Sequence, residues 1–151
     1  MPTSIDFIRA SRKIIEVLDN IQEFSEATKL VREFNKSFEI PVSNKPIVGE
    51  EKDFTLKHKL LLEEVQEYLE ACKNNDIVEI ADSLTDIMYV LLGTVLHHGL
   101  SNVYYDLFLE VHASNMSKLE KGKVLRRSDG KVMKGTEYFK PNLKDIINER
   151  Y

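Results

Sequence analysis

Hydrophobic side chains recur every three or four residues along most of the chain, which is the spacing of amphipathic helices. This pattern predicts helices over about 4–18, 22–37, 54–73, 77–98 and 102–118, followed by a short helix over about 143–149. Residues 41–53 contain two prolines and a glycine, which predict a loop between the second and third helices. We therefore expect an all-α fold, an antiparallel bundle of about five helices.

The helix predicted over 77–98 differs from the others, because apolar residues cover it nearly all round. Such a helix is typical of the middle of a bundle, so we expect it to be buried. Asp76 is a good N-cap residue for it, after a polar turn of Asn74 and Asn75, and Gly99 ends it. The two helices that flank this turn should pack as an antiparallel pair.

The chain changes character after residue 118. Residues 119–142 carry glycines and basic residues in place of a helical stripe, and Asp129-Gly130 lies between short β-prone runs. We predict a basic loop there, with a small hairpin. The whole chain, 1–151, is predicted to be a single helical domain, of which residues 1–21 form an N-terminal helical extension.

Composition narrows the class of protein. The 151 residues are 42% hydrophobic and 30% charged with a net charge of −4, which is ordinary for a globular domain and gives no basic surface overall. Cys72 is the single cysteine, which excludes an intrachain disulfide and a zinc site of several thiolates. Asp6, Arg9 and Arg12 interrupt any signal-peptide core, and the apolar stretch 87–99 is too short to span a bilayer. A soluble, cytoplasmic protein is expected.

Carboxylates on the two central helices form the strongest chemical pattern. There are seven of them: Glu63, Glu64, Glu67, Glu70, Glu79, Asp82 and Asp86. Many stand three or four residues apart, so each helix carries its acids along one face. In an antiparallel pair the two sets meet level by level, in the pairs Glu70–Glu79, Glu67–Asp82 and Glu64 or Glu63 with Asp86.

Few basic residues are available to neutralise these acids. Residues 74–117 contain neither lysine nor arginine, and only Lys73 lies between Lys59 and Lys118. Clustered carboxylates raise one another's pKa and destabilise a fold unless a cation binds among them. An all-oxygen set of ligands suits Mg²⁺, Mn²⁺ or Ca²⁺.

The acids admit two other interpretations. A solvated helix face is the ordinary explanation for Glu63, Glu64, Glu67 and Glu70, but the apolar setting of Glu79, Asp82 and Asp86 argues against it for the second helix. A di-iron carboxylate bundle requires Glu-x-x-His pairs, and no histidine stands at the matching positions.

Positive charge is concentrated just after the last long helix. Residues 118–134 hold seven basic side chains: Lys118, Lys121, Lys123, Arg126, Arg127, Lys131 and Lys134. A basic segment together with a cation-binding acid cluster suits a polyphosphate, whose oxygens bind both metal ions and ammonium or guanidinium groups. A merely solvated hairpin and a nucleic-acid contact are the alternatives.

Histidine and cysteine give weaker signals. His97 and His98 end the helix over 77–98, where a donor or positive group suits the C-terminus, and we interpret both as structural. His112 precedes Asn115 by three residues, and either faces the site or is structural. Cys72 is interpreted as a small helix residue near the turn.

The acid pattern, Glu63-Glu64-x-x-Glu67 and then Glu79-x-x-Asp82, resembles the signature of the all-α nucleoside triphosphate pyrophosphohydrolases. That superfamily includes MazG-like enzymes, dimeric dUTPases and phosphoribosyl-ATP pyrophosphohydrolases. The resemblance covers about residues 23–145 and includes FNKSFEIPVSNKP (34–46), ADSLTDIMYVLLGT (81–94), EVHASNMSKL (110–119) and DGKVMKGTEYFKPNL (129–143). These segments resemble the subgroup that contains MazG-like dUTP-hydrolysing enzymes.

The resemblance implies hydrolysis of a nucleoside triphosphate to the monophosphate and pyrophosphate, with dUTP as the first expected substrate. It implies Mg²⁺, or alternatively Mn²⁺, bound by Glu64, Glu67, Glu79 and Asp82. Glu63 is the expected base, and Asp86 is either a further ligand or a residue that orients the ligands. The expected substrate contacts are Asn115, Lys118, Lys131, Lys134, Tyr89 and Lys59.

One feature departs from the family, which often has an arginine just before the acid helix. Here the stretch is TLKHKLLLEE, so Lys57 or Lys59 takes that place without the bidentate phosphate contact of an arginine. The family pattern also implies a homodimer or a dimer of dimers, and we expect no nucleic-acid or membrane partner. Phosphoribosyl-ATP hydrolysis and a non-catalytic nucleotide-binding regulator are the alternative functions.

Overall fold

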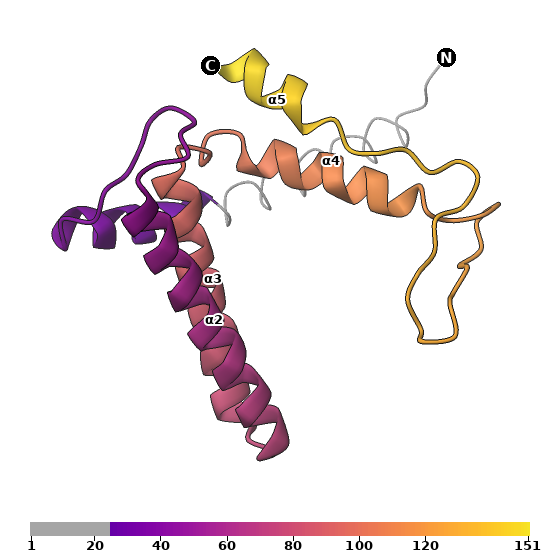
Figure 1. Ribbon diagram of the computed structural model, residues 1–151, viewed down its shortest axis with the longest axis horizontal. Helices are drawn as coiled ribbons and strands as arrows, with labels where there is room; N and C mark the ends of the chain where they lie inside the picture. The colour runs from indigo at the N-terminus through magenta and orange to yellow at the C-terminus, as the bar shows by residue number, and fades with distance from the viewer. Residues whose placement is uncertain (1–24) are drawn as a thin grey trace, which may run out of the picture. The chain divides into compact units, whose positions relative to one another are not determined.

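The computed structural model describes residues 25–151, and the helix predicted over 4–18 lies outside them. Helical backbone covers 25–37, and α2 (Glu51–Lys73), α3 (Ile77–His97), α4 (Tyr104–Met116) and α5 (Leu143–Arg150) follow it (Figure 1). Between residues 25 and 151 no strand is formed, so the predicted all-α class is confirmed. The chain divides into two compact units, the first ending at Ser101 and the second covering Asn102–Tyr151. The predicted single domain and its subdivision stay predictions.

The core of the first unit lies where the helical segment 25–37 meets the second half of α3. Val31, Leu92 and Leu96 are buried there together, and Ala27 and Val42 pack against them. Their burial holds the N-terminal segment against the C-terminal half of α3, because apolar area removed from water is the main stabilising term in folding.

The predicted loop after Pro41 is fastened to the end of α3 by backbone contacts. The Ser43 amide donates to the Leu96 carbonyl, and the Ile47 amide to the His98 carbonyl, both at 3.0 Å. Gly99 follows α3 with a φ of +70°, and a Cβ there would lie 2.0 Å from the Lys45 carbonyl oxygen. Only glycine therefore fits this junction, which fixes the direction in which the chain leaves the helix.

The prediction that α3 is buried is wrong for its first half, as far as residues 25–151 can cover it. Ile77 and Val78 are 74% and 70% exposed, whereas Leu92 and Leu96 are 2% and 0% exposed. The helical segment 25–37 covers only the second half of α3, and beyond it α2 and α3 continue as a two-helix hairpin (Figure 1). Two helices bury only the faces they share, so the remaining apolar side chains stay uncovered.

The second unit is built on α4 and the segment that returns along it. Arg150 of α5 pairs with Asp106 at 3.1 Å, and the Asn142 amide donates to the Glu110 carboxylate at 2.8 Å. Between α4 and α5 lie two turns, marked by isolated antiparallel bridges between Glu120 and Lys123 and between Arg126 and Val132. The second turn contains Asp129-Gly130, so the predicted hairpin forms as a short turn without extended strands.

Among the helices of residues 25–151, none has the length and the apolar character that crossing a membrane requires.

Candidate active site

A tight turn brings the two acid-bearing helices together. Asn75 has a positive φ of 53°, a conformation that asparagine tolerates better than most residues, and the chain reverses there between α2 and α3. Asp76 caps α3 as predicted, since its carboxylate accepts hydrogen bonds from the Val78 and Glu79 amides at 3.0 and 3.1 Å. The helices then pack side by side as an antiparallel pair (Figure 1).

Glu64 lies at the centre of the acid cluster. Its Oε2 atom is buried and has no hydrogen-bond partner in the described part of the chain. Burial raises the pKa of Glu64 above its usual value, and the charges of Glu67, Asp86, Glu63 and Asp82 raise it further, in that order. Since Asp86 and Asp82 belong to the facing helix, this agrees with the predicted antiparallel arrangement.

Four of the other acids border two hollows on the hairpin. Glu67, Glu70 and Glu79 line a hollow of about 430 Å³ between the end of α2 and the start of α3, together with Gln66 and Ser83. A second hollow, of about 470 Å³, lies on α3 and is lined by Asp82 and again by Glu79. Both Glu79 and Asp82 are exposed, so the expectation that their helix offers them no solvated face is wrong for these two acids.

Glu70 differs from the other six acids, because it has a cation of its own. Its carboxylate lies 2.9 Å from the Lys73 ammonium and accepts a second hydrogen bond from Gln66 at 3.1 Å. These contacts, that with Lys73 first, lower the pKa of Glu70. The other six acids form no ion pair with any residue between 25 and 151.

The acids of the hairpin lie close enough for their charges to interact, but they do not form a preformed metal site among the described residues. Within the described residues, no group of three histidine, cysteine, aspartate or glutamate side chains is arranged to hold a metal ion. Charges act over longer distances than ligand bonds, so the acids can raise the pKa of Glu64 without surrounding one point. The structure therefore brings the predicted ligands onto one hairpin, while their ligation of a metal stays a prediction.

Lys59 and Tyr89 both belong to the first unit. Lys59 is exposed on α2, and its neighbour Lys57 is half-buried, with a pKa lowered by burial. Tyr89 of α3 packs edge to face against Phe34, at 5.5 Å between ring centroids. This packing explains the position of Tyr89 without any ligand.

Asn115 and Lys118, at the end of α4, belong to the second unit. They stand one helical turn apart, and the Lys118 ammonium donates to the Asn115 side-chain oxygen at 2.6 Å. Lys134 stacks over the Tyr138 ring, 4.3 Å from its centroid. Three of the expected substrate contacts, Asn115, Lys118 and Lys134, thus each have a defined neighbour in the second unit.

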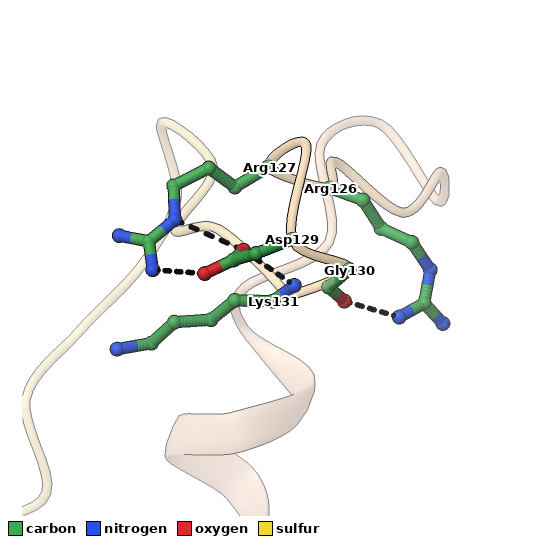
Figure 2. A network of polar contacts seen from close by, with 5 residues as sticks. All are labelled: Arg126, Arg127, Asp129, Gly130 and Lys131. Atoms are coloured by element: carbon green, nitrogen blue, oxygen red, sulfur yellow. Dashed lines mark hydrogen bonds and ion pairs between the residues drawn. The ribbon is translucent and has the colours of Figure 1, made fainter.

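The tip of the basic loop is held by one acid. Asp129 forms an ion pair with Arg127 and accepts a hydrogen bond from the Lys131 amide at 3.1 Å, while Arg126 donates to the Gly130 carbonyl at 2.9 Å (Figure 2). The Lys131 side chain runs alongside the Arg127–Asp129 pair in this view, and its ammonium makes none of the contacts drawn (Figure 2). Asp129 thereby shapes the turn, and leaves Lys131 as an exposed cation.

The two histidines at the end of α3 are held within the first unit. His98 shares a hydrogen bond with the Ile47 carbonyl at 3.0 Å, and His97 is 3% exposed at the base of the hairpin. Its Nε2 atom is buried without a hydrogen-bond partner among the described residues. His112 and Cys72 are exposed.

Sequence reasoning missed the residues that fasten the returning segment to α4. Ser114 donates to the Phe139 carbonyl at 2.8 Å, and Ser117 accepts from the Phe139 amide at 3.1 Å. Glu120 binds both the amide and the hydroxyl of Thr136. The three-residue spacing of the two serines in SNMSKL was the available signal, since it places them on one face of a helix.

A comparison with protein families agrees with this geometry. A sequence model described as phosphoribosyl-ATP pyrophosphohydrolase matches residues 31–115, more than half of the chain and the whole of the acid-bearing hairpin. The basic loop lies beyond the matched residues. No curated protein matches the chain. The chain therefore belongs to the phosphoribosyl-ATP pyrophosphohydrolase family, within the MazG-like superfamily of nucleotide pyrophosphohydrolases.

Proposed function

We propose that the protein is a Mg²⁺-dependent nucleoside triphosphate pyrophosphohydrolase, which converts a nucleoside or deoxynucleoside triphosphate, with dUTP the first expected, to the monophosphate and pyrophosphate. One observation carries the proposal: Glu64 buries an unpaired carboxylate oxygen among like charges, on the hairpin that matches the family. A fold keeps such a destabilising arrangement where it has a use, and a divalent cation relieves it.

The chemistry of the ligands fits a hard cation. Glu64, Glu67, Glu79 and Asp82 offer only carboxylate oxygens, which Mg²⁺ prefers and Mn²⁺ accepts. Glu67, Glu79 and Asp82 are exposed and free to rotate, so side-chain rotation toward Glu64 is the change that ligation requires. When bound, Mg²⁺ would neutralise charge on the phosphate oxygens and orient the triphosphate.

Glu63 would act as the general base. Its carboxylate is exposed next to Glu64, and is held by no ion pair within the described residues. A water molecule that transfers a proton to Glu63 attacks a phosphorus, so that one P–O bond forms, the anhydride P–O bond between the α and β phosphates breaks, and monophosphate and pyrophosphate separate. Asp86 is half-buried on the facing helix, where it would either bind the metal or orient Glu64.

Basic and polar residues would bind the rest of the substrate. Lys118, Lys131 and Lys134 would bind phosphate oxygens, while Asn115 would contact sugar or phosphate and orient Lys118. Lys59 would take the place of the arginine common in the family. Tyr89 would border the sugar or base where its ring is not covered by Phe34.

A second candidate function is the hydrolysis of phosphoribosyl-ATP, because the family model carries that description. It requires the same acids and the same release of pyrophosphate, so the substrate alone separates the two. A non-catalytic nucleotide-binding regulator would bind nucleotide without turnover.

We also propose a homodimer or a dimer of dimers. Apolar side chains of the hairpin, including Leu62 and Val65 of α2 and Ile77 and Val78 of α3, are at least half exposed, at 58%, 50%, 74% and 70%. Large apolar side chains exposed along one hairpin suit an interaction with another protein surface. A second copy would cover the half of α3 that residues 25–37 leave open.

Product analysis tests the activity. Purified protein with Mg²⁺ would be given dUTP, other nucleoside triphosphates and phosphoribosyl-ATP in water enriched in ¹⁸O. The proposal predicts pyrophosphate and monophosphate, with the label in one of these two products. Orthophosphate and a diphosphate as the products, or binding without any product, would contradict it.

A further inference from the structure

The basic loop is closed at its base by a set of contacts centred on Glu120. Its Oε2 atom accepts a hydrogen bond from the Thr136 amide at 2.6 Å, and its Oε1 atom accepts one from the Thr136 hydroxyl at 3.0 Å. The Gly135 amide donates to the Lys118 carbonyl at 3.0 Å. Residues 118–120 and 134–136 are therefore held side by side, although the loop separates them in the sequence.

Two further features show that the Glu120 contact is closely fitted. The Glu120 amide and carbonyl exchange hydrogen bonds with Lys123 at 2.8 and 2.9 Å, which fixes the backbone of Glu120 in a tight turn. A Cβ on Gly135 would lie 2.9 Å from Glu120 Oε2, and 3.0 Å from the carbonyl oxygens of Leu119 and Lys118. The approach of the two segments thus depends on glycine at 135 and on a hydrogen-bonding side chain at 120.

We propose that Glu120 is a positioning residue, which holds Lys118 and Lys134 at the base of one loop so that both bind the same polyphosphate. Lys118 lies two residues before Glu120, and Lys134 lies two residues before Thr136, so the Glu120–Thr136 contact fixes the register of the two lysines. The inference rests on the proposed function, in which these lysines bind phosphate.

Charge shows why an acid at this place needs an explanation. A carboxylate inside a cation-rich segment weakens the attraction of that segment for an anion. By its charge alone, Glu120 therefore opposes phosphate binding. Its two hydrogen bonds offset this unfavourable charge. They order the loop before the ligand arrives, so that the loop loses less conformational entropy when it binds. If Glu120 acts through its geometry, removing its side chain should weaken phosphate binding. If it acted only through its charge, the same change should strengthen binding.

The test compares variants of the full chain for affinity toward inorganic pyrophosphate, measured by calorimetry with EDTA present so that metal ions play no part. Glu120→Ala should weaken binding about tenfold, the effect of losing a charge-assisted hydrogen bond. Glu120→Gln carries the same charge as Glu120→Ala but still bonds to Thr136, and should restore most of the affinity. Gly135→Ala should weaken binding without any change of charge.

Glu137→Ala is the matched control, since Glu137 is an exposed acid in the same segment and accepts none of the hydrogen bonds that close the loop. It should bind pyrophosphate at least as well as the wild type. Far-UV circular dichroism should show equal helix content in all variants. With a nucleotide substrate, Glu120→Ala should raise KM more than it lowers kcat.

Three results would overturn the proposal: a wild type that does not bind pyrophosphate, a Glu120→Ala variant that binds as well as the wild type, or a Glu120→Gln variant as weak as Glu120→Ala. Failure of the proposed enzymatic function is recognised separately. A wild type that turns over no nucleotide contradicts the activity, whereas the pyrophosphate affinities still decide the role of Glu120.

Discussion

The carboxylate of Glu70 lies 2.9 Å from the ammonium of Lys73, one helical turn further along α2. This pair separates Glu70 from the other acids of the hairpin, because it supplies the cation that they lack. Glu70→Gln should therefore keep turnover within about twofold of the wild type, because Glu70 already has its own cation and an exposed ion pair of this kind contributes little. Steady-state kinetics would check this, with Glu67→Gln as the matched change that should abolish activity.

Glu64 should govern the pH dependence of the metal-free protein. Its pKa is raised in the folded state, so the folded form holds the proton more tightly and stability is lost as pH rises through the folded pKa. Glu64→Gln removes this loss, and should raise Tm at pH 7 by roughly 2–4 °C per kcal/mol gained. Thermal melts in EDTA between pH 4 and 8 measure it, and an unchanged or lower Tm at pH 7 would contradict the account.

The helices were predictable because their apolar spacing is local, and Asp76 and Gly99 mark the ends of α3 as expected. The exposure of Ile77 and Val78 was not predictable, because an apolar side chain does not reveal whether its own chain or a second copy covers it. The meeting of Glu64 with Asp86 followed from helix geometry, whereas the Glu120–Thr136 contact depends on a loop path that no periodic pattern encodes.

His97 should make the protein less stable in mild acid. Burial lowers its pKa most, followed by the charges of His98 and Lys57, while Asp53 and the Pro41 carbonyl act in the opposite sense. The unfolded state then binds the proton more readily, so stability is complete above about pH 6.5 and falls as pH drops toward the folded pKa. His97→Gln should flatten the dependence of Tm on pH between 5 and 7. The exposed His112→Gln is the control, and an equal effect of both would contradict this role.

Gly99→Ala should destabilise the first unit strongly. The new Cβ would meet the Lys45 carbonyl in a backbone with positive φ, and strain of this kind costs about 2 kcal/mol or more. Urea unfolding followed by circular dichroism measures the loss. Gly122→Ala is the comparison, because Gly122 also has a positive φ of 74° but no atom within 4 Å of its Cβ position. Equal losses would show that the contact with Lys45 is unimportant.

A dimer formed through the hairpin should dissociate when its exposed apolar residues become charged. Leu62→Lys combined with Ile77→Lys places two cations on this surface, and burying them without partners would cost several kcal/mol. Light scattering after gel filtration should give twice 17.5 kDa or more for the wild type and 17.5 kDa for the variant. A wild type that is monomeric at micromolar concentration would refute the proposed assembly.

The account as a whole depends on turnover at the acid-bearing hairpin. The most direct measurement is the rate of pyrophosphate release with Mg²⁺, for the wild type and Glu64→Gln, with dUTP and phosphoribosyl-ATP as substrates. The account predicts release from at least one substrate by the wild type, and a loss of about 10³-fold or more in a Glu64→Gln variant with unchanged helix content. Release at the wild-type rate by Glu64→Gln, or no release from either substrate by the folded wild type, would contradict it.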